Sequence, residues 1–532
     1  MRVFRSFIGL TCGAATMAML ASPTRAQLKD IFQAPNPVDE GIHKIFIAEI
    51  GAGRGDVSTP GSSLFIIGRD PFRAIRRGRQ VFQRKFLLRE GLWDERREGA
   101  IAADPDIGAG LADSCAGCHG RPRGSPGHGG NTFTRPDSRD ARHLFGLGLQ
   151  EILADEITAE LRAIRSDALA LARRTHTPQT VNLDSSKGPR YGAITALPNG
   201  HVDVSELEGV DSDLRVRPFQ AQGGSFAIRE MVVGELKAEM GLEAPDADLF
   251  IAARGGRVTT PSGMLLDGRA DRIAGPPVTT PAQDGDGDGK ANEIPLAIVD
   301  YLESFLLNSF SPGTGRADTP EVMVGRAIFS QLGCQGCHLA NLPIDRDRRV
   351  VDVDTAFDPV NGGPFNGLFA TVTSLVAAGA SPAPSTRVPP LQPPAGDAFL
   401  VRNLFTDFKR HDLGPAYHER NFDGSLHRTF MTAPLWGLAS TAPYGHDGRS
   451  ATIEQAILRH GGEAQIARDG FAALTAETRL WLLDFLNTLQ LFPPEDTASN
   501  LQPANPMAGG FPQTGHGAIA LTSLFVNPRD LE

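Results

Sequence analysis

Two cysteine–histidine motifs constrain this chain more than any other feature. Both have the pattern Cys-x-x-Cys-His, and they comprise Cys115, Cys118 and His119 in one copy and Cys334, Cys337 and His338 in the other. This pattern attaches c-type haem, because the two sulfurs reach the vinyl positions on one porphyrin edge while the next residue places an imidazole under the iron. The sequence therefore predicts two covalently bound haem c groups, with His119 and His338 as iron ligands.

Other uses of these cysteines explain less of the pattern. Two disulfides in an oxidising compartment would account for the four thiols, and a structural zinc site would account for the two pairs. Neither requires a histidine directly after each pair. An iron–sulfur cluster needs four nearby thiolates, whereas these pairs lie more than two hundred residues apart.

The start of the chain has the pattern of a secretory signal peptide. Arg2 and Arg5 precede an apolar run over residues 7–20, and small residues follow it. The run is shorter than the ~20 residues that span a bilayer, and an uncleaved membrane anchor is the alternative. We expect residues 1–26 to be removed, a periplasmic location, and no membrane span in the mature chain. Removal also takes away Cys12, so every remaining cysteine belongs to a motif.

Acidic side chains outnumber basic ones. The chain has 62 Asp and Glu against 52 Lys and Arg, a net charge of −10 at pH 7, and the charged residues of the predicted signal peptide are all basic. Nucleic-acid binding depends on neutralising phosphates with Lys and Arg, so nucleic acid is not an expected partner.

An internal repeat accompanies the two motifs. Gly78–Phe82 and Gly325–Phe329 share the pattern Gly-Arg-x-aliphatic-Phe, and each precedes one motif. Downstream, Ile298–Leu307 resembles Leu482–Leu491. Two amphipathic helices can look alike by chance, but the order helix, motif, helix occurs twice.

The repeat predicts a mostly α fold with two tandem cytochrome c-like haem domains and long loop insertions. We expect an N-terminal domain over residues 27–310, a C-terminal domain over residues 311–495 and a tail over residues 496–532. The proline-rich residues 377–396 read as a surface loop.

An acidic loop lies near the end of the predicted N-terminal domain. Asp284, Asp286 and Asp288 alternate with glycines, as in a calcium-binding loop. Position 12 of a full EF-hand loop would be Pro295 instead of Glu, so a solvated acidic turn is the alternative. Calcium is thus a candidate second cofactor.

Several segments resemble the bacterial di-haem cytochrome c peroxidase superfamily. Residues 431–462 include a Pro-Tyr-x-His-Asp-Gly segment at Pro443–Gly448. Residues 142–151 and 408–414 resemble its di-haem oxidoreductase branch, also described as thiol-oxidoreductase-like. The likeness covers most of residues 65–495.

The resemblance implies a ligand for the second haem. In these peroxidases the residue fourteen places after the histidine of that segment is the second axial ligand, and here the position holds His460. Peroxidases usually have Met there and a methylamine-maturation relative has Tyr, so the implied haem has two histidine ligands and a lower potential. His446 is then expected to stabilise the local structure or to bind the haem propionates through hydrogen bonds. Trp436 is a candidate for electron passage between the haems, with core packing as the alternative.

In the family the first haem is the reactive one. His128 is a candidate displaceable ligand opposite His119, with an ordinary loop histidine as the alternative. Glu151 resembles the acid of the family's catalytic pocket, where a carboxylate could take a proton from peroxide and return it to the leaving oxygen. The alternative is that Glu151 has no catalytic role and is an ordinary residue of a long helix that extends through residue 173.

The resemblance implies an exported oxidoreductase of the peroxidase type. It would reduce hydrogen peroxide, or use it in an oxidation, with electrons from a small redox protein such as a cytochrome c or a cupredoxin. Two other classes stay open. A non-catalytic di-haem electron-transfer cytochrome would need both irons fully ligated, and a di-haem oxygenase of the rubber-cleaving type also combines two such motifs with a similar C-terminal segment.

Overall fold

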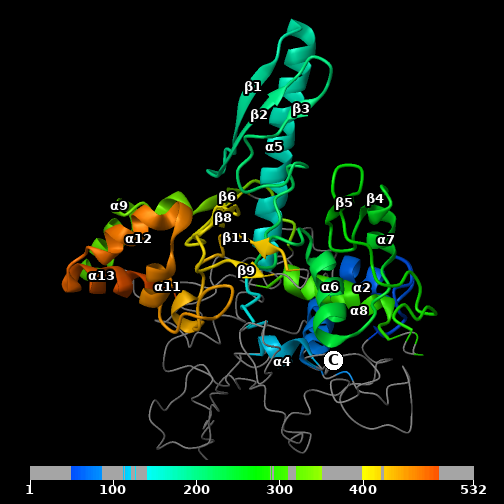
Figure 1. Ribbon diagram of the computed structural model, residues 1–532. Helices are drawn as coiled ribbons and strands as arrows, with labels where there is room; N and C mark the ends of the chain where they lie inside the picture. Colours follow the sequence, from blue (N-terminus) through cyan, green and yellow to red (C-terminus); the bar gives the residue numbers. More distant parts are fainter. Residues whose placement is uncertain are drawn as a thin grey trace, which may run out of the picture.

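The computed structural model describes residues 50–84, 86, 112, 114–120, 126–127, 141–287, 289, 291, 293–309, 319–349, 398–420 and 424–489. Two groups of helices lie on either side of a projecting arm, with short strands between them (Figure 1). The predicted signal peptide, the proline-rich loop, His128, Asp288 and the tail lie outside the described residues. No helix among the described residues is long and apolar enough to cross a membrane.

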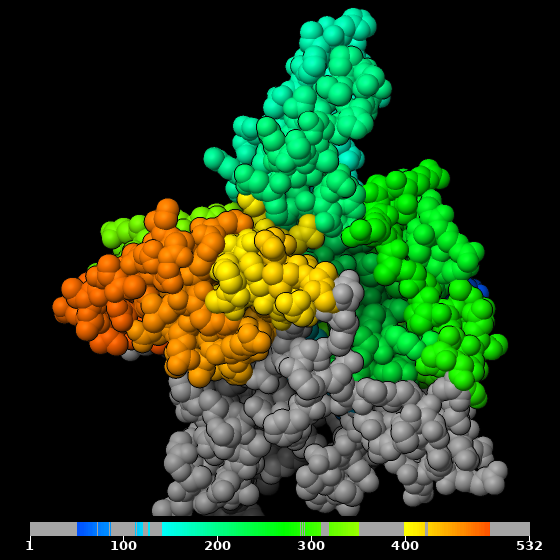
Figure 2. Space-filling model, in the orientation of Figure 1, coloured from blue at the N-terminus to red at the C-terminus, as the bar shows by residue number. Residues whose placement is uncertain are grey.

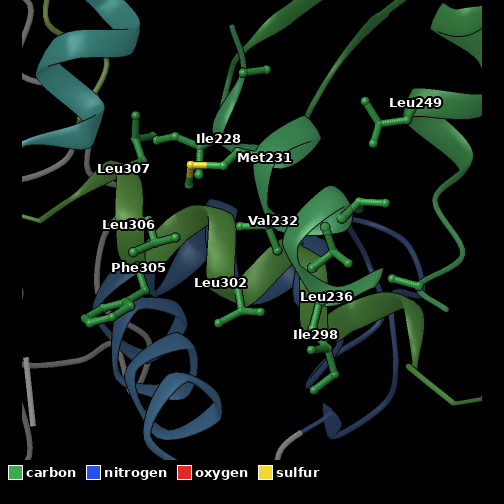
Figure 3. Close-up of a cluster of buried hydrophobic side chains, with 14 of the residues drawn as sticks. Ile228, Met231, Val232, Leu236, Leu249, Ile298, Leu302, Phe305, Leu306 and Leu307 are labelled. Carbon is green, nitrogen blue, oxygen red and sulfur yellow. The ribbon is translucent and has the colours of Figure 1, made fainter. Parts of the chain in front are cut away.

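The first helical group consists of α2 (Ser63–Arg69), α3 (Pro71–Gln83), α6 (Ile228–Met240), α7 (Ala247–Ala253) and α8 (Leu296–Leu307). α8 is buried from Ala297 to Leu307. Figure 3 shows its apolar side chains beside those of α6, among them Leu302, Leu306, Val232 and Leu236. Full burial of such a side chain contributes ~1.5–3 kcal/mol, so this contact is the main core of the group.

A buried arginine fastens α6 to α8. The guanidinium of Arg229 lies 2.8 Å from Asp300 and 2.7 Å from Glu303, both on α8, and 2.7 Å from Asp246. A charge removed from water is tolerated when it is paired and hydrogen-bonded, which explains how α8 stays buried while carrying two carboxylates.

The second helical group consists of α9 (Pro320–Gln331), α11 (Ile453–Arg459), α12 (Gln465–Ala472) and α13 (Ala476–Leu486). Its core is aromatic: the ring of Phe329 meets those of Phe405 and Phe485 edge to face, with centroids 5.7 and 5.6 Å apart. This geometry places the positive edge of one ring against the negative face of the next.

The same helix crossing occurs in both groups. A Cβ on Gly78 of α3 would lie 2.0 Å from the carbonyl oxygen of Tyr301 on α8, and one on Gly325 of α9 would lie 1.9 Å from that of Trp481 on α13. Only glycine permits such contact between backbones. α3 and α9 also begin alike, with a side chain capping the first turn and proline at the first helical position. The boundary predicted between residues 310 and 311 lies outside the described residues, and the assignment of two cytochrome c-like domains stays a prediction.

The projecting arm is built on α5 (Leu147–Thr175). Its outer half carries a three-stranded antiparallel sheet of β1 (Gln179–Asp184), β2 (Arg190–Ala196) and β3 (Val202–Asp203), and it stands out from the body (Figures 1 and 2). The inner half packs on β6 (Leu342–Ile344) and on residues that follow β7 (Phe399–Val401). α5 therefore shares one apolar core with the C-terminal part of the chain.

Short elements complete the described fold. The pairs β4 with β5, β6 with β7, β8 with β11 and β9 with β10 are all antiparallel. The remaining bounds are α4 (Cys115–His119), β4 (Arg257–Thr259), β5 (Leu265–Asp267), β8 (Arg410–Asp412), β9 (Glu419–Arg420), β10 (Leu426–His427) and β11 (Thr429–Met431).

Candidate haem site

Both Cys-x-x-Cys-His motifs open on one cavity. Its volume is about 850 Å³, and its lining includes both cysteines and the histidine of each motif. The first motif forms α4, capped by the Ser114 side chain, which accepts a hydrogen bond from Gly117 N. The second begins with a single 3-10 turn at Cys334–Gly336 that follows α9. Most other lining residues are apolar, including Phe82, Leu302, Leu306, Phe329, Phe471 and Leu482.

The four motif cysteines are free thiols in this structure. Burial raises the pKa of Cys115 to about 12 and that of Cys334 to about 11, so both stay protonated at neutral pH. Both cysteine pairs thus lie beside an apolar cavity, where their sulfurs could form thioethers with a porphyrin.

The motif histidines are held in the orientation that a haem ligand needs. The Nδ1–H of His119 donates to the carbonyl oxygen of Arg142 at 2.7 Å, and that of His338 donates to Phe405 at 3.0 Å. A hydrogen bond at Nδ1 fixes the tautomer of His338 and leaves its Nε2 as the lone-pair donor. His119 has a second backbone hydrogen bond, to Gly127. Burial lowers the pKa of both histidines to about 4, so both imidazoles are neutral at pH 7 and able to bind iron.

His460 has the same arrangement. It follows α11, its Nδ1–H donates to the carbonyl oxygen of Ala456 at 2.7 Å, and it lines the cavity. Burial lowers its pKa, and it lies near enough to lower the pKa of His338 electrostatically. Two neutral imidazoles with free Nε2 atoms thus lie on the second motif's part of the cavity. These residues fit a haem with two histidine ligands.

His446 and Trp436 also line the cavity. The ring of His446 stacks on Phe430 at 3.6 Å, and its Nε2 lies 3.2 Å from Glu419. Trp436 is buried, and its indole N–H donates to the carbonyl oxygen of Arg402 at 3.2 Å. Both side chains are therefore held by protein contacts at the cavity wall.

Glu151 does not line the cavity. Its carboxylate accepts a hydrogen bond from Ile228 N at 2.7 Å and pairs with Arg348. Burial raises its pKa, and the charge of Arg348 opposes that shift. These contacts give Glu151 a structural role at the start of α6, and its catalytic role stays a prediction.

Three other glutamates do line the cavity, Glu463 and a pair on α6. Glu235 and Glu239 lie one turn apart on α6, on the face that also presents Leu236 and Met240 to the cavity. Gln220 donates a hydrogen bond to Glu235 at 2.8 Å. Burial raises the pKa of Glu235, and its charge acts on Cys115, which locates it near the first motif.

Sequence reasoning missed this pair, although a signal for it existed. The i, i+4 spacing of two acids on one face of an apolar helix placed them together. Only packing decided that this face borders the cavity.

A third charged group lies beside the second motif. The ring of His411 bonds through Nε2 to Asp407 at 2.9 Å and through Nδ1 to Glu463 at 2.6 Å. Burial would lower its pKa, but hydrogen bonds to Asp407 and Cys337 outweigh that effect and raise the pKa to about 11. His411 is therefore a fixed positive charge at the cavity wall at neutral pH.

The acidic loop is arranged differently from an EF-hand. Asp284 accepts hydrogen bonds from the backbone of Gly287 and Gly289. Asp286 instead approaches Glu243 and Glu293, with one oxygen of each within 4.8 Å of the others. Lys237 lies 2.8 Å from Asp286 and 3.0 Å from Glu243. Among the described residues, these three carboxylates could hold a cation together. A site that includes Asp288 stays a prediction, because Asp288 lies outside the described residues.

A cavity that presents two Cys-x-x-Cys-His motifs and neutral, oriented imidazoles defines the class as a haem-binding redox protein. Residues 398–489 match the family described as "Di-haem oxidoreductase, putative peroxidase". The match confirms the resemblance to di-haem oxidoreductases that the sequence indicated.

Comparison with individual proteins adds little. No curated protein matches the chain. Hydrazine synthase of Kuenenia stuttgartiensis, solved under xenon pressure, is similar at 16% identity over 38% of this chain and 59% of that chain, with a TM-score of 0.22. A superposition this loose supports no argument about fold or function.

Proposed function

We propose that this chain is an exported di-haem c-type oxidoreductase that reduces hydrogen peroxide or uses it in an oxidation. One observation carries the proposal: the two attachment motifs and the carboxylates of Glu235 and Glu239 line the same cavity. In this proposal the two helical groups belong to two cytochrome c-like domains, and the predicted signal peptide directs the chain to the periplasm.

The proposed reaction divides the work between haem and protein. Reduction of peroxide consumes two electrons and two protons and yields two waters. Haem bound through thioethers would supply the redox-active iron at each motif. His119 would hold the iron of the first site, and His338 with His460 that of the second.

Proton movement falls to the glutamates. Glu235 or Glu239 would take the proton from one peroxide oxygen and deliver it to the oxygen that leaves. Burial raises the pKa of Glu235, so this carboxylate holds a transferred proton more readily than an exposed glutamate would. Gln220 would orient the carboxyl group through its hydrogen bond to Glu235 Oε1.

Electrons would come from a small periplasmic redox protein, a cytochrome c or a cupredoxin. The test is a steady-state assay with the reduced donor and hydrogen peroxide, accompanied by spin-resonance spectra. We expect donor oxidation that depends on peroxide and a high-spin signal from the first site. Two low-spin sites and no turnover after any pre-reduction would indicate an electron carrier, whereas dioxygen consumption with an apolar polymer would indicate the oxygenase.

We also propose that the acidic loop binds calcium through Asp286, Glu243 and Glu293. Carboxylate oxygens are the ligands that Ca²⁺ prefers, and a bound cation stabilises the folded form. Calcium should raise the melting temperature of the wild type and not that of Glu293→Gln. Two results together would contradict calcium binding: no calcium by elemental analysis, and a melting temperature that a chelator does not change. Lys237 would then be the cation that neutralises this cluster.

A further inference from the structure

A chain of hydrogen bonds starts at the first motif histidine. The Nδ1–H of His119 donates to the carbonyl oxygen of Arg142 at 2.7 Å. The next residue, His143, bonds through Nε2 to the carbonyl oxygen of Trp436 at 2.7 Å. Its ring stacks on Phe145, with centroids 5.7 Å apart and planes inclined by 29°. The bond from His143 crosses from the N-terminal part of the chain to the C-terminal part.

The chain of bonds continues to the second motif histidine. Leu435, which precedes Trp436, donates its N–H to the carbonyl oxygen of Leu404 at 3.0 Å. The next residue, Phe405, accepts the Nδ1–H of His338 at 3.0 Å. Phe405 has a φ of 56°, a left-handed conformation that is uncommon for a bulky residue and that needs support from its surroundings.

Four hydrogen bonds and three peptide units thus join His119 to His338. All four distances lie in the ordinary range for N–H···O bonds. Between the two terminal histidines, His143 is the one side chain on the route; every other link is backbone. Both ends are the residues predicted to bind iron.

We propose that this route carries electrons between the two haem sites, with His143 as the positioning residue that connects its halves. The inference rests on the proposed function, because it requires haem at both motifs. With haem bound at both motifs, His338 and His119 would hold the donor and the acceptor: the His338 site would lose one electron and the His119 site would gain it. No proton moves along the route, because each donor nitrogen keeps its proton.

The physical reason lies in electronic coupling. Over the same length, coupling falls less steeply through covalent and hydrogen bonds than across a van der Waals gap, so a continuous bonded route is a candidate path for the electron. On this route, the His143 bond is the link between the segment at Arg142 and the segment at Trp436. The competing route passes through the indole ring of Trp436, which lines the same cavity.

The test compares variants of the full-length, haem-loaded protein. A single electron is injected by pulse radiolysis in the absence of peroxide. Its redistribution between the two sites is followed at wavelengths where their absorbance differs. A variant that keeps only one motif identifies those wavelengths. His143→Leu should slow redistribution several-fold. His143→Gln should restore it, because the Gln amide nitrogen lies near the place of imidazole Nε2, whereas the shorter His143→Asn should not.

His427 provides the matched control. Its Nε2 also bonds to a backbone carbonyl, that of Thr429 at 2.8 Å, but it lies off the route. His427→Leu should therefore redistribute electrons at the wild-type rate. Melting temperature, haem content and visible spectra identify any variant that fails to fold.

Two outcomes would overturn the proposal. One is wild-type redistribution in both His143→Leu and His143→Asn. The other is slow redistribution in Trp436→Phe together with a wild-type rate in His143→Leu. Because Trp436→Phe keeps the backbone carbonyl acceptor, that result would assign the route to the indole ring. Neither outcome depends on peroxide turnover, and a missing second haem would appear in the haem content, so failure of the proposed function is seen separately.

Discussion

The imidazole Nε2 of His143 lies 2.7 Å from the carbonyl oxygen of Trp436, across 293 positions of sequence. The bond joins the segment that follows the first motif to Trp436, which lines the cavity. Because His119 and His338 each bond to a backbone carbonyl on opposite sides of this contact, hydrogen bonds from imidazole rings to main-chain carbonyls help to position the two motifs relative to one another.

Covalent haem attachment is the first prediction. The wild type, produced in cells with haem-attachment machinery, should retain the mass of two haems after denaturation. Replacing Cys115 and Cys118 with serine should remove one haem, because the thioether bonds are lost, and should leave the second in place. Mass spectrometry and haem staining measure this. Colour lost entirely to acid–acetone extraction would contradict covalent attachment.

The ligand role of His460 gives the second prediction. His460→Ala should convert one low-spin site to a high-spin or substitute-ligated form while both covalent links persist. His460→Met should raise the potential of that site, because a thioether favours reduced iron more than an imidazole does. Optical spectra and redox titration measure both effects, with His427→Ala as the control. Identical spectra in wild type and both variants would remove His460 from the site.

Proton transfer is tested by three conservative substitutions. Glu235→Gln or Glu239→Gln should slow peroxide turnover by roughly 10²-fold, the usual contribution of a positioned acid–base group. Reduction of the second site should remain normal, because its predicted ligands lie elsewhere. Glu151→Gln tests the original sequence-based prediction and should act mainly on stability, since it weakens the contacts with Arg348 and Ile228. Turnover lost in Glu151→Gln alone would reverse the assignment.

The charged pair at His411 predicts a pH dependence. Its pKa is about 11 in the folded protein against 6.5 for an ordinary histidine. The folded state therefore keeps a proton on His411 that the unfolded state releases as the pH rises above about 6.5. The contribution of His411 to the free energy of unfolding is full below about pH 6.5 and is lost as the pH rises toward 11. Denaturant unfolding at about pH 6 and about pH 9 should show a larger loss of stability for wild type than for His411→Gln. Equal losses would mean that the pair does not stabilise the fold.

The repeated helix crossing gives the last prediction. Gly325→Ala would place a methyl group 1.9 Å from the carbonyl oxygen of Trp481, and such overpacking costs ~1–3 kcal/mol of unfolding free energy. Gly78→Ala should behave alike. Gly234→Ala is the control, because nothing lies within 4 Å of its new Cβ and alanine favours a helix by ~1 kcal/mol over glycine. Equal stability of Gly325→Ala and wild type would show that the crossing relaxes.

Local features of the fold were readable from the sequence. The helices around Gly78 and Gly325 show apolar periodicity, and the helix predicted through residue 173 ends at Thr175. The antiparallel sheet of β1, β2 and β3 on α5 was not predicted, because strand pairing depends on partners that the pattern of one segment does not identify. The sequence also gave no indication that α5 shares a core with β6 and β7.

The sequence by itself determined the chemistry: which residues are cysteines and histidines, and which imidazole follows each pair. Their spacing is a local property, written in consecutive residues. Only the tertiary structure decided what surrounds them: one cavity for both motifs, Glu235 at its wall and Glu151 away from it. The physical reason is that a side chain's neighbours are set by the packing of elements far apart in sequence, as the bond from His143 to Trp436 illustrates.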